Sequence, residues 1–142
     1  GIPVSSSPRE ILKKARNVDR RVALLAAELE KLDRDLQTLK SVDYSKPIVQ
    51  ASGGHGEVET TAIRIADRKA ELSAAIQNQF SIRADAIEIV HSLPEGPERD
   101  VLTQRYILCN SWDQVASNLH YVYRYCVQLH NSAMKKISHN LT

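Results

Sequence analysis

The polar side chains best suited to chemistry lie near the C-terminal end of the chain, where Arg124, Gln128 and Asn131 recur at steps of four and three. In a helix this spacing places them on one side. Arginine, glutamine and asparagine can each pair with base edges in the DNA major groove, and tyrosine can reach a phosphate. The pattern therefore predicts a helix that reads double-stranded DNA. We expect Arg124 and Gln128 to contact base edges, and we expect backbone contacts from Tyr123, Tyr125, Asn131 and Lys135.

Other chemistry finds no support in the sequence. The histidines are scattered, with no carboxylate or cysteine at ligand spacing; four of them are His91, His120, His130 and His139. The glycine-rich run Gly53–Gly56 lacks the preceding strand and the Lys-Ser/Thr pair of a phosphate loop. No Ser/His/Asp arrangement can be placed on strand-borne elements. We expect no enzyme, metal or cofactor.

The predicted DNA-reading helix follows a short helix and a turn. Ser111 and Gln114 have the spacing of a capping box, in which each side chain bonds to the other residue's backbone amide. Val115, Ala116 and Leu119 then share one face of the helix, and Tyr121 is an apolar residue inside the turn. A second helix is expected from about Val122, and its core face is expected to consist of Cys126, Leu129, Ala133 and Ile137. Upstream, Pro94 and Pro97 open a bracing helix that carries Val101, Leu102, Arg105 and Tyr106.

The first half of the chain predicts long helices. Ser7, Pro8 and Glu10 have the order of a helix start. An unbroken heptad pattern follows, which is typical of a coiled-coil seam, through Ile11, Ala15, Val18, Val22, Leu25, Leu29, Leu32, Leu36 and Leu39.

A second long helix is expected over Glu57–His91, after a connector at about 42–56. Its apolar face is predicted to hold Val58, Ala62, Ile65, Leu72, Ile76, Phe80, Ala84 and Ile87, with Lys69 reaching out from the seam. The two helices predict an antiparallel hairpin. Pairing with a second copy of the chain is the alternative, and both arrangements together would give a dimeric bundle.

Composition agrees with a small helical protein. The chain has 142 residues, only five glycines and five prolines, and a net charge of +2. We predict an all-α fold with a helical region at 1–92 and a helix-turn-helix domain at 93–142. The low charge is weak for a nucleic-acid binder, because phosphate contacts need cations, and it suits a module that binds as a homodimer or with a partner. The sequence has no apolar run near twenty residues and no metal spacing at Cys109 or Cys126, so we expect no membrane and a reduced cytoplasmic setting.

The C-terminal segment resembles region four of bacterial sigma factors. The resemblance lies in Leu93-Pro94, Val101-Leu102, Arg105-Tyr106, Trp112, Val115-Ala116, Leu119 and the stretch from Ala133 to Ile137. The chain is more similar still to phage late-transcription regulators of the ArpU/RinA type. These are also sigma-like, and they tend to carry stretches like Asp43–Ser45 and Val49–Ser52. The resemblance covers most of the chain from about Val42. Two positions depart from the pattern: His120 replaces the usual turn glycine, and Val122 replaces the usual serine cap.

For this family the resemblance implies promoter binding and control of late phage genes, in the cytoplasm of a bacterial host. In that role we expect the helical hairpin to dimerise the protein or to dock it on RNA polymerase. Two alternatives stay open. A small terminase-like subunit for DNA packaging also joins such a motif to oligomerising helices, usually in the opposite order. A helical adaptor would use the sigma-like domain as a protein surface, and the low net charge favours that reading.

Overall fold

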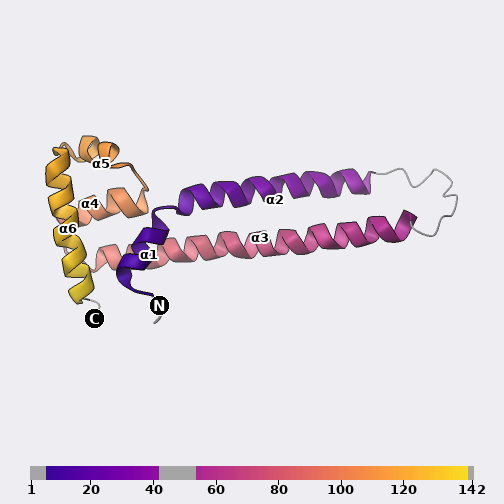
Figure 1. Cartoon of the computed structure of the whole chain (residues 1–142), viewed down its shortest axis with the longest axis horizontal. Helices are drawn as coiled ribbons and strands as arrows, with labels where there is room; N and C mark the ends of the chain where they lie inside the picture. The colour runs from indigo at the N-terminus through magenta and orange to yellow at the C-terminus, as the bar shows by residue number, and fades with distance from the viewer. Residues whose placement is uncertain (1–5, 42–53, 141–142) are drawn as a thin grey trace. The chain divides into compact units, whose positions relative to one another are not determined.

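The computed structural model describes residues 6–41 and 54–140, and no strand occurs among them. The elements, shown in Figure 1, are α1 (Pro8–Ala15), α2 (Val18–Lys40), α3 (Gly54–His91), α4 (Pro97–Leu102), the π-helical turn η1 (Thr103–Ile107), α5 (Trp112–Leu119) and α6 (Tyr123–Asn140). The predicted all-α class is confirmed. Of the predicted connector, residues 42–53 lie outside the described residues, and 54–56 are already helical.

The chain divides into two compact units. The first unit comprises 1–21 and 78–142, and the second comprises 22–77, so α2 and α3 each contribute to both. This division differs from the expected one at residue 92. The reason is that α1 and the last turns of α3 share a core with α4, η1 and α6. That core contains Ile11, Leu12, Ala15, Ala86, Ile89, Val90, Leu93, Leu102, Tyr106, Ala133, Met134 and Ile137.

The first helix of the first unit begins as predicted but ends early. The Ser7 hydroxyl accepts a hydrogen bond from the Glu10 amide, and Pro8 occupies the first turn. The prediction of one unbroken helix from Ile11 to Leu39 is wrong, because α1 ends at Ala15 and α2 starts at Val18. The physical reason is the width of the apolar face: Ile11 and its neighbour Leu12 are both buried in the core of the unit. A coiled-coil seam would have buried only one of two adjacent residues.

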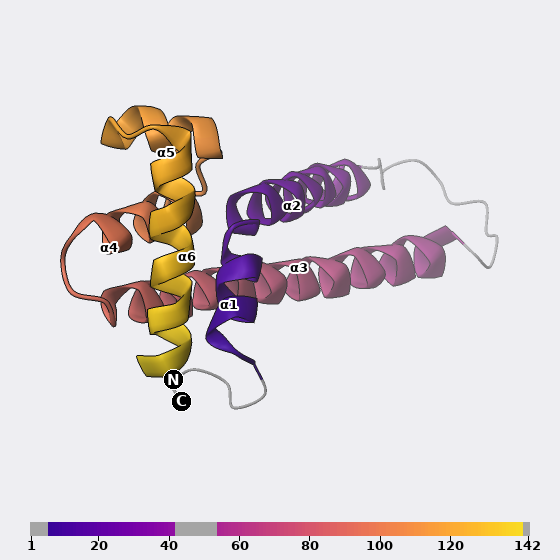
Figure 2. The same ribbon diagram turned by 60° about the vertical axis from the view of Figure 1, so that its left-hand side comes forward.

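The second unit contains the heptad part of α2. The predicted seam positions are all half-buried while most of their neighbours are exposed; they are Val22, Leu25, Leu29, Leu32, Leu36 and Leu39. Helices α2 and α3 lie side by side in Figures 1 and 2. Arg68 of α3 pairs with Glu28 of α2 at 2.8 Å, and Lys69 pairs with Asp33. Lys69 therefore reaches out of the seam to a carboxylate, as its position predicted.

The prediction of the apolar face of α3 is partly wrong. Phe80 is 48% exposed, and Ala84 and Ile87 are exposed as well. The side chains buried in this stretch of the first unit are Ala86, Ile89 and Val90. Each step of four residues turns a helix about 40° past a full circle. The two consecutive steps of four from Ile76 through Phe80 to Ala84 therefore rotate the predicted face away from the core.

Candidate nucleic-acid interface

Helix α5 is held at its start by the predicted capping box. The Ser111 hydroxyl accepts from the Gln114 amide at 3.2 Å, and the Gln114 side chain accepts from the Ser111 amide at 2.9 Å. Buried Val115 faces a small core with Val101 and Cys126. Partly buried Trp112, Ala116, Leu119, Tyr121 and Leu129 pack against that core. The sequence thus positions α5 through its cap and one apolar side.

The turn between α5 and α6 uses a left-handed residue. His120 has φ 60° and ψ 37°. Histidine is among the residues enriched in this conformation, which lets His120 take the place of a glycine. The Tyr121 amide donates to the Ala116 carbonyl at 3.0 Å and closes the end of α5. The Val122 carbonyl accepts from the Cys126 amide at 3.2 Å, so α6 is entered at Val122, whose side chain cannot cap it.

Helix α6 packs one side inward. Cys126, Ala133 and Ile137 are buried as predicted, and Leu129 is partly buried. Met134 is also buried, which the sequence reading missed. In the first unit α6 lies against both α4 and α1 (Figure 2), and the Arg9 guanidinium of α1 donates to the Ser138 hydroxyl at 3.2 Å. This packing determines which side of α6 stays open.

Every side chain predicted to contact DNA lies on the exposed part of α6. These are Tyr123, Arg124, Tyr125, Gln128, Asn131 and Lys135. One stripe follows steps of four, three and four along the helix, through Arg124, Gln128, Asn131 and Lys135. At 1.5 Å per residue the stripe is roughly 16 Å long. The Tyr125 ring meets that of Tyr121 edge-on with centroids 5.0 Å apart, so an aromatic contact helps to orient it.

The charge of α6 is entirely positive. The sequence from 123 to 140 holds Arg124, Lys135 and Lys136 and no acidic residue. Lys136 is engaged by Glu98 of α4 at 2.5 Å, and hydrogen bonds from Lys136 and Ser132 lower the pKa of the Glu98 carboxyl. Lys136 therefore fastens α6 to α4, whereas Lys135 is an exposed member of the stripe.

Behind the stripe lies a polar and aromatic cluster that the sequence reading missed. The Tyr106 hydroxyl and His130 Nε2 are 2.6 Å apart. The Trp112 ring meets His130 edge-on at 5.1 Å, and the Arg105 guanidinium lies 4.6 Å over the Trp112 ring. The signal for this cluster was the position of His130, which follows Cys126 by four residues and precedes Ala133 by three. That spacing puts His130 on the inner side of α6.

Burial controls the ionisation of this cluster. Burial lowers the pKa of His130, and nearby Arg105 and Arg9 lower it further, whereas the hydrogen bond that the imidazole donates to the Asn131 side chain raises it. Burial also raises the pKa of Tyr106. The phenol therefore keeps its proton near neutral pH and donates it to the neutral imidazole.

The sequence also gave no indication of a structural role for Cys109. This residue follows η1 and has a φ of 59°. Its thiol donates to the Ala15 carbonyl at 3.4 Å and so contacts the end of α1. Within 6–41 and 54–140, no three His, Cys, Asp or Glu side chains are grouped to hold a metal ion. No helix in those ranges is both long enough and apolar enough to cross a membrane.

No protein family, no curated protein and no solved structure matches the chain.

Proposed function

We propose that the chain is a sequence-specific, double-stranded DNA-binding transcription regulator, of the type that activates late phage genes. In this proposal α5 and α6 form a helix-turn-helix in a domain like sigma-factor region four, and α6 enters the major groove. The observation that carries the proposal is the outer stripe of α6. It exposes Arg124, Gln128 and Asn131 on a helix without acidic residues, while the opposite side is packed into the unit.

The position of the turn supports the same reading. A capped short helix, a left-handed turn residue and a longer second helix are what a helix-turn-helix requires. The N-terminal residues of the second helix then meet base edges, which suits Arg124 and Gln128, because they lie in its first two turns. Lys135 lies farther along the helix, where a phosphate contact is expected.

For this function we propose that the long helices α2 and α3 form an antiparallel hairpin, which supports a homodimer or docks on RNA polymerase. The half-buried seam of α2 and the ion pairs of Arg68 and Lys69 support pairing within one chain. The exposed Phe80 and Ile87 of α3 offer an apolar surface to a second copy. A symmetric dimer would read half-sites about 34–36 Å apart, or one turn of the DNA helix.

The first test is selection of DNA from a random pool, followed by binding measurements with Arg124→Ala/Gln128→Ala. Each paired base contact contributes about 1–3 kcal/mol of discrimination. The double variant should therefore lose about 30-fold or more of its preference for the selected site. A matched control is Arg64→Ala/Gln77→Ala, which removes exposed residues of the same types from α3. Equal discrimination by both variants, with unchanged circular dichroism, would reject α6 as the reading helix.

A salt titration tests the phosphate contacts separately. Affinity for DNA should fall linearly on a logarithmic scale of salt concentration, and Lys135→Ala should reduce the slope by about 0.9 if it removes one phosphate contact. The slope of the Lys40→Ala control, which changes an exposed lysine at the end of α2, should stay at the wild-type value.

A second candidate function is a protein-binding adaptor. It is favoured by apolar side chains exposed near the α5–α6 turn and after η1, namely Leu108, Val122 and Tyr123. An adaptor would show no selected DNA sequence, and its binding to a partner such as RNA polymerase would weaken in Leu108→Ser/Val122→Ser. The DNA regulator should keep its discrimination between DNA sequences in that variant.

A further inference from the structure

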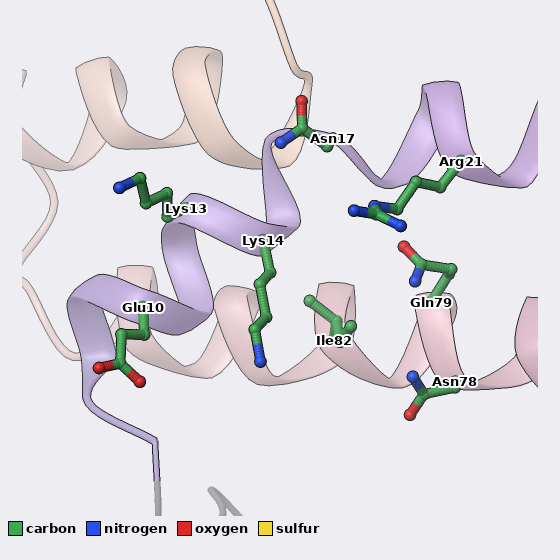
Figure 3. Close-up of a pocket in the computed structure, with 8 residues that line it drawn as sticks. All are labelled: Glu10, Lys13, Lys14, Asn17, Arg21, Asn78, Gln79 and Ile82. Atoms are coloured by element: carbon green, nitrogen blue, oxygen red, sulfur yellow. The ribbon is translucent and has the colours of Figure 1, made fainter.

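A concave pocket of about 460 Å³ lies in the first unit, between α1, the first turn of α2 and α3 (Figure 3). None of the proposed DNA-contacting residues lines it. The lining residues are Glu10, Lys13, Lys14, Asn17, Arg21, Asn78, Gln79 and Ile82. Small-molecule pockets in proteins usually measure about 300–1,000 Å³, so this one has room for a compact metabolite.

The lining is strongly basic. The lining residues include three basic side chains, Lys13, Lys14 and Arg21, and one carboxylate, that of Glu10. None of the three basic side chains forms an ion pair with another residue in 6–41 or 54–140, although ion pairs occur along α2 and α3 nearby. Because Lys13 points away in Figure 3, Lys14 and Arg21 are the two cations available to a ligand, and together they match the charge of a dianion.

Amide side chains provide further hydrogen-bonding groups. The Asn17 oxygen accepts from the Arg20 guanidinium at 3.3 Å, which leaves its amide nitrogen to donate. The Gln79 oxygen is buried and has no partner. In Figure 3, Arg21 and Gln79 point toward one another, Lys14 extends from α1 across α3, and Lys13 points away. A buried acceptor without a partner costs free energy, and a ligand with a hydroxyl or amine hydrogen would remove that cost.

The break between α1 and α2 creates this arrangement. Ile11, Leu12 and Ala15 are buried and hold α1 rigidly, so Lys14 projects from a fixed helix. The turn at Arg16 and Asn17 then carries the chain into α2, and the Arg21 amide donates to the Asn17 carbonyl at 3.0 Å. Cations from two differently directed helices thus line one pocket beside α3.

We propose that this pocket binds a small molecule that carries a phosphate group. The planar guanidinium of Arg21 can make paired hydrogen bonds to phosphate oxygens, and Lys14 adds a point charge. The side chain of Ile82 supplies an apolar wall, and the amides of Asn78 and Gln79 can bond to polar groups on the rest of the ligand. Recognition of this ligand is independent of the proposed DNA contacts on α6.

The experiment titrates the full chain with inorganic phosphate, phenyl phosphate and phenol, and it follows the side-chain amide signals of Asn17, Asn78 and Gln79 by nuclear magnetic resonance. The shifts of these signals should saturate at millimolar concentrations of inorganic phosphate. Phenyl phosphate should bind more tightly, because its ring can contact Ile82. Phenol should produce no saturable change. Shifts by phosphate and phenyl phosphate that stay linear with concentration would overturn the proposal.

A matched pair of variants tests the assigned cations. Lys14→Gln/Arg21→Gln should raise the dissociation constant for phenyl phosphate about tenfold or more, since each tenfold step corresponds to only about 1.4 kcal/mol. Lys40→Gln/Arg64→Gln removes the same charges from exposed positions outside the pocket and should change it less than about twofold. Equal weakening in both variants would show a general charge effect and reject the site. Displacement of phenyl phosphate by random-sequence duplex would assign the pocket to nucleic acid and also overturn the proposal.

Discussion

Acid should destabilise the first unit through one side chain, His130. Its imidazole lies against Tyr106 of η1 and Trp112 of α5, and the charged Arg105 and Arg9 are close enough to influence it. Burial is the main cause that lowers the pKa of His130, and these two cations act in the same direction. Protonation would also place a proton on the nitrogen that accepts the Tyr106 hydrogen bond.

The sign of the pH effect follows from this direction. In the unfolded chain a histidine has a pKa of about 6.5, and in the folded unit the pKa of His130 is lower. Between the two values the unfolded state binds a proton that the folded state does not bind. The contribution of His130 to stability is therefore complete above about pH 6.5 and is lost as the pH falls toward the folded pKa. A single proton limits the slope to about 1.4 kcal/mol per pH unit, which is measurable against a total stability of about 5–15 kcal/mol.

The assay is urea unfolding between about pH 5.5 and about pH 8, followed by the fluorescence of Trp112, the only tryptophan in the chain. His130→Gln keeps an acceptor for the Tyr106 hydroxyl but cannot titrate, so its free energy of unfolding should lose the slope that His130 contributes. The control is His120→Asn, which changes an exposed histidine and tolerates the left-handed turn. The carboxyl of Glu98, whose pKa is lowered, changes charge only below this range. Parallel pH profiles for wild type and His130→Gln would refute the reasoning.

Other predictions concern the elements that hold α6. Ser111→Ala removes the cap shared with Gln114 and should cost about 0.5–2 kcal/mol of unfolding free energy in urea, whereas Ser117→Ala on the exposed side of α5 should cost less than about 0.5 kcal/mol. Equal costs would reject the role of the capping box. Val122→Ser should raise the melting temperature, with a gain of about 0.5–2 kcal/mol, because the valine side chain is 72% exposed and cannot cap α6. An unchanged or lower melting temperature would show that another group already satisfies the start of α6. Ile137→Ala should cost about 2–5 kcal/mol in the same urea assay, since this side chain is fully buried, and a cost below about 1 kcal/mol would contradict its place in the core.

Local features could be read directly from the sequence. The caps at Ser7 and Ser111 and the buried positions of Cys126, Ala133 and Ile137 were all predicted. The exposure of Arg124 and its neighbours on α6 follows from the same helical spacing. These features depend on residues within three or four positions of one another, so a single stretch of chain contains all the information that they require.

Features that join distant residues were not predictable in this way. The end of α1 at Ala15 depends on a core shared with Ile89 of α3 and Ile137 of α6. The bond between Tyr106 and His130 spans 24 residues, and the pocket joins Lys14 and Arg21 to Gln79.

Sequence by itself thus determined that the chain is helical, where the capped helices α1 and α5 start and which side of α6 is polar. Only the tertiary structure decided where the heptad pattern breaks, which side of α3 is covered and which polar groups meet. The physical reason is that hydrophobic burial is proportional to area but has no direction. An apolar stripe therefore shows that a side chain needs a partner without showing which distant residue provides it.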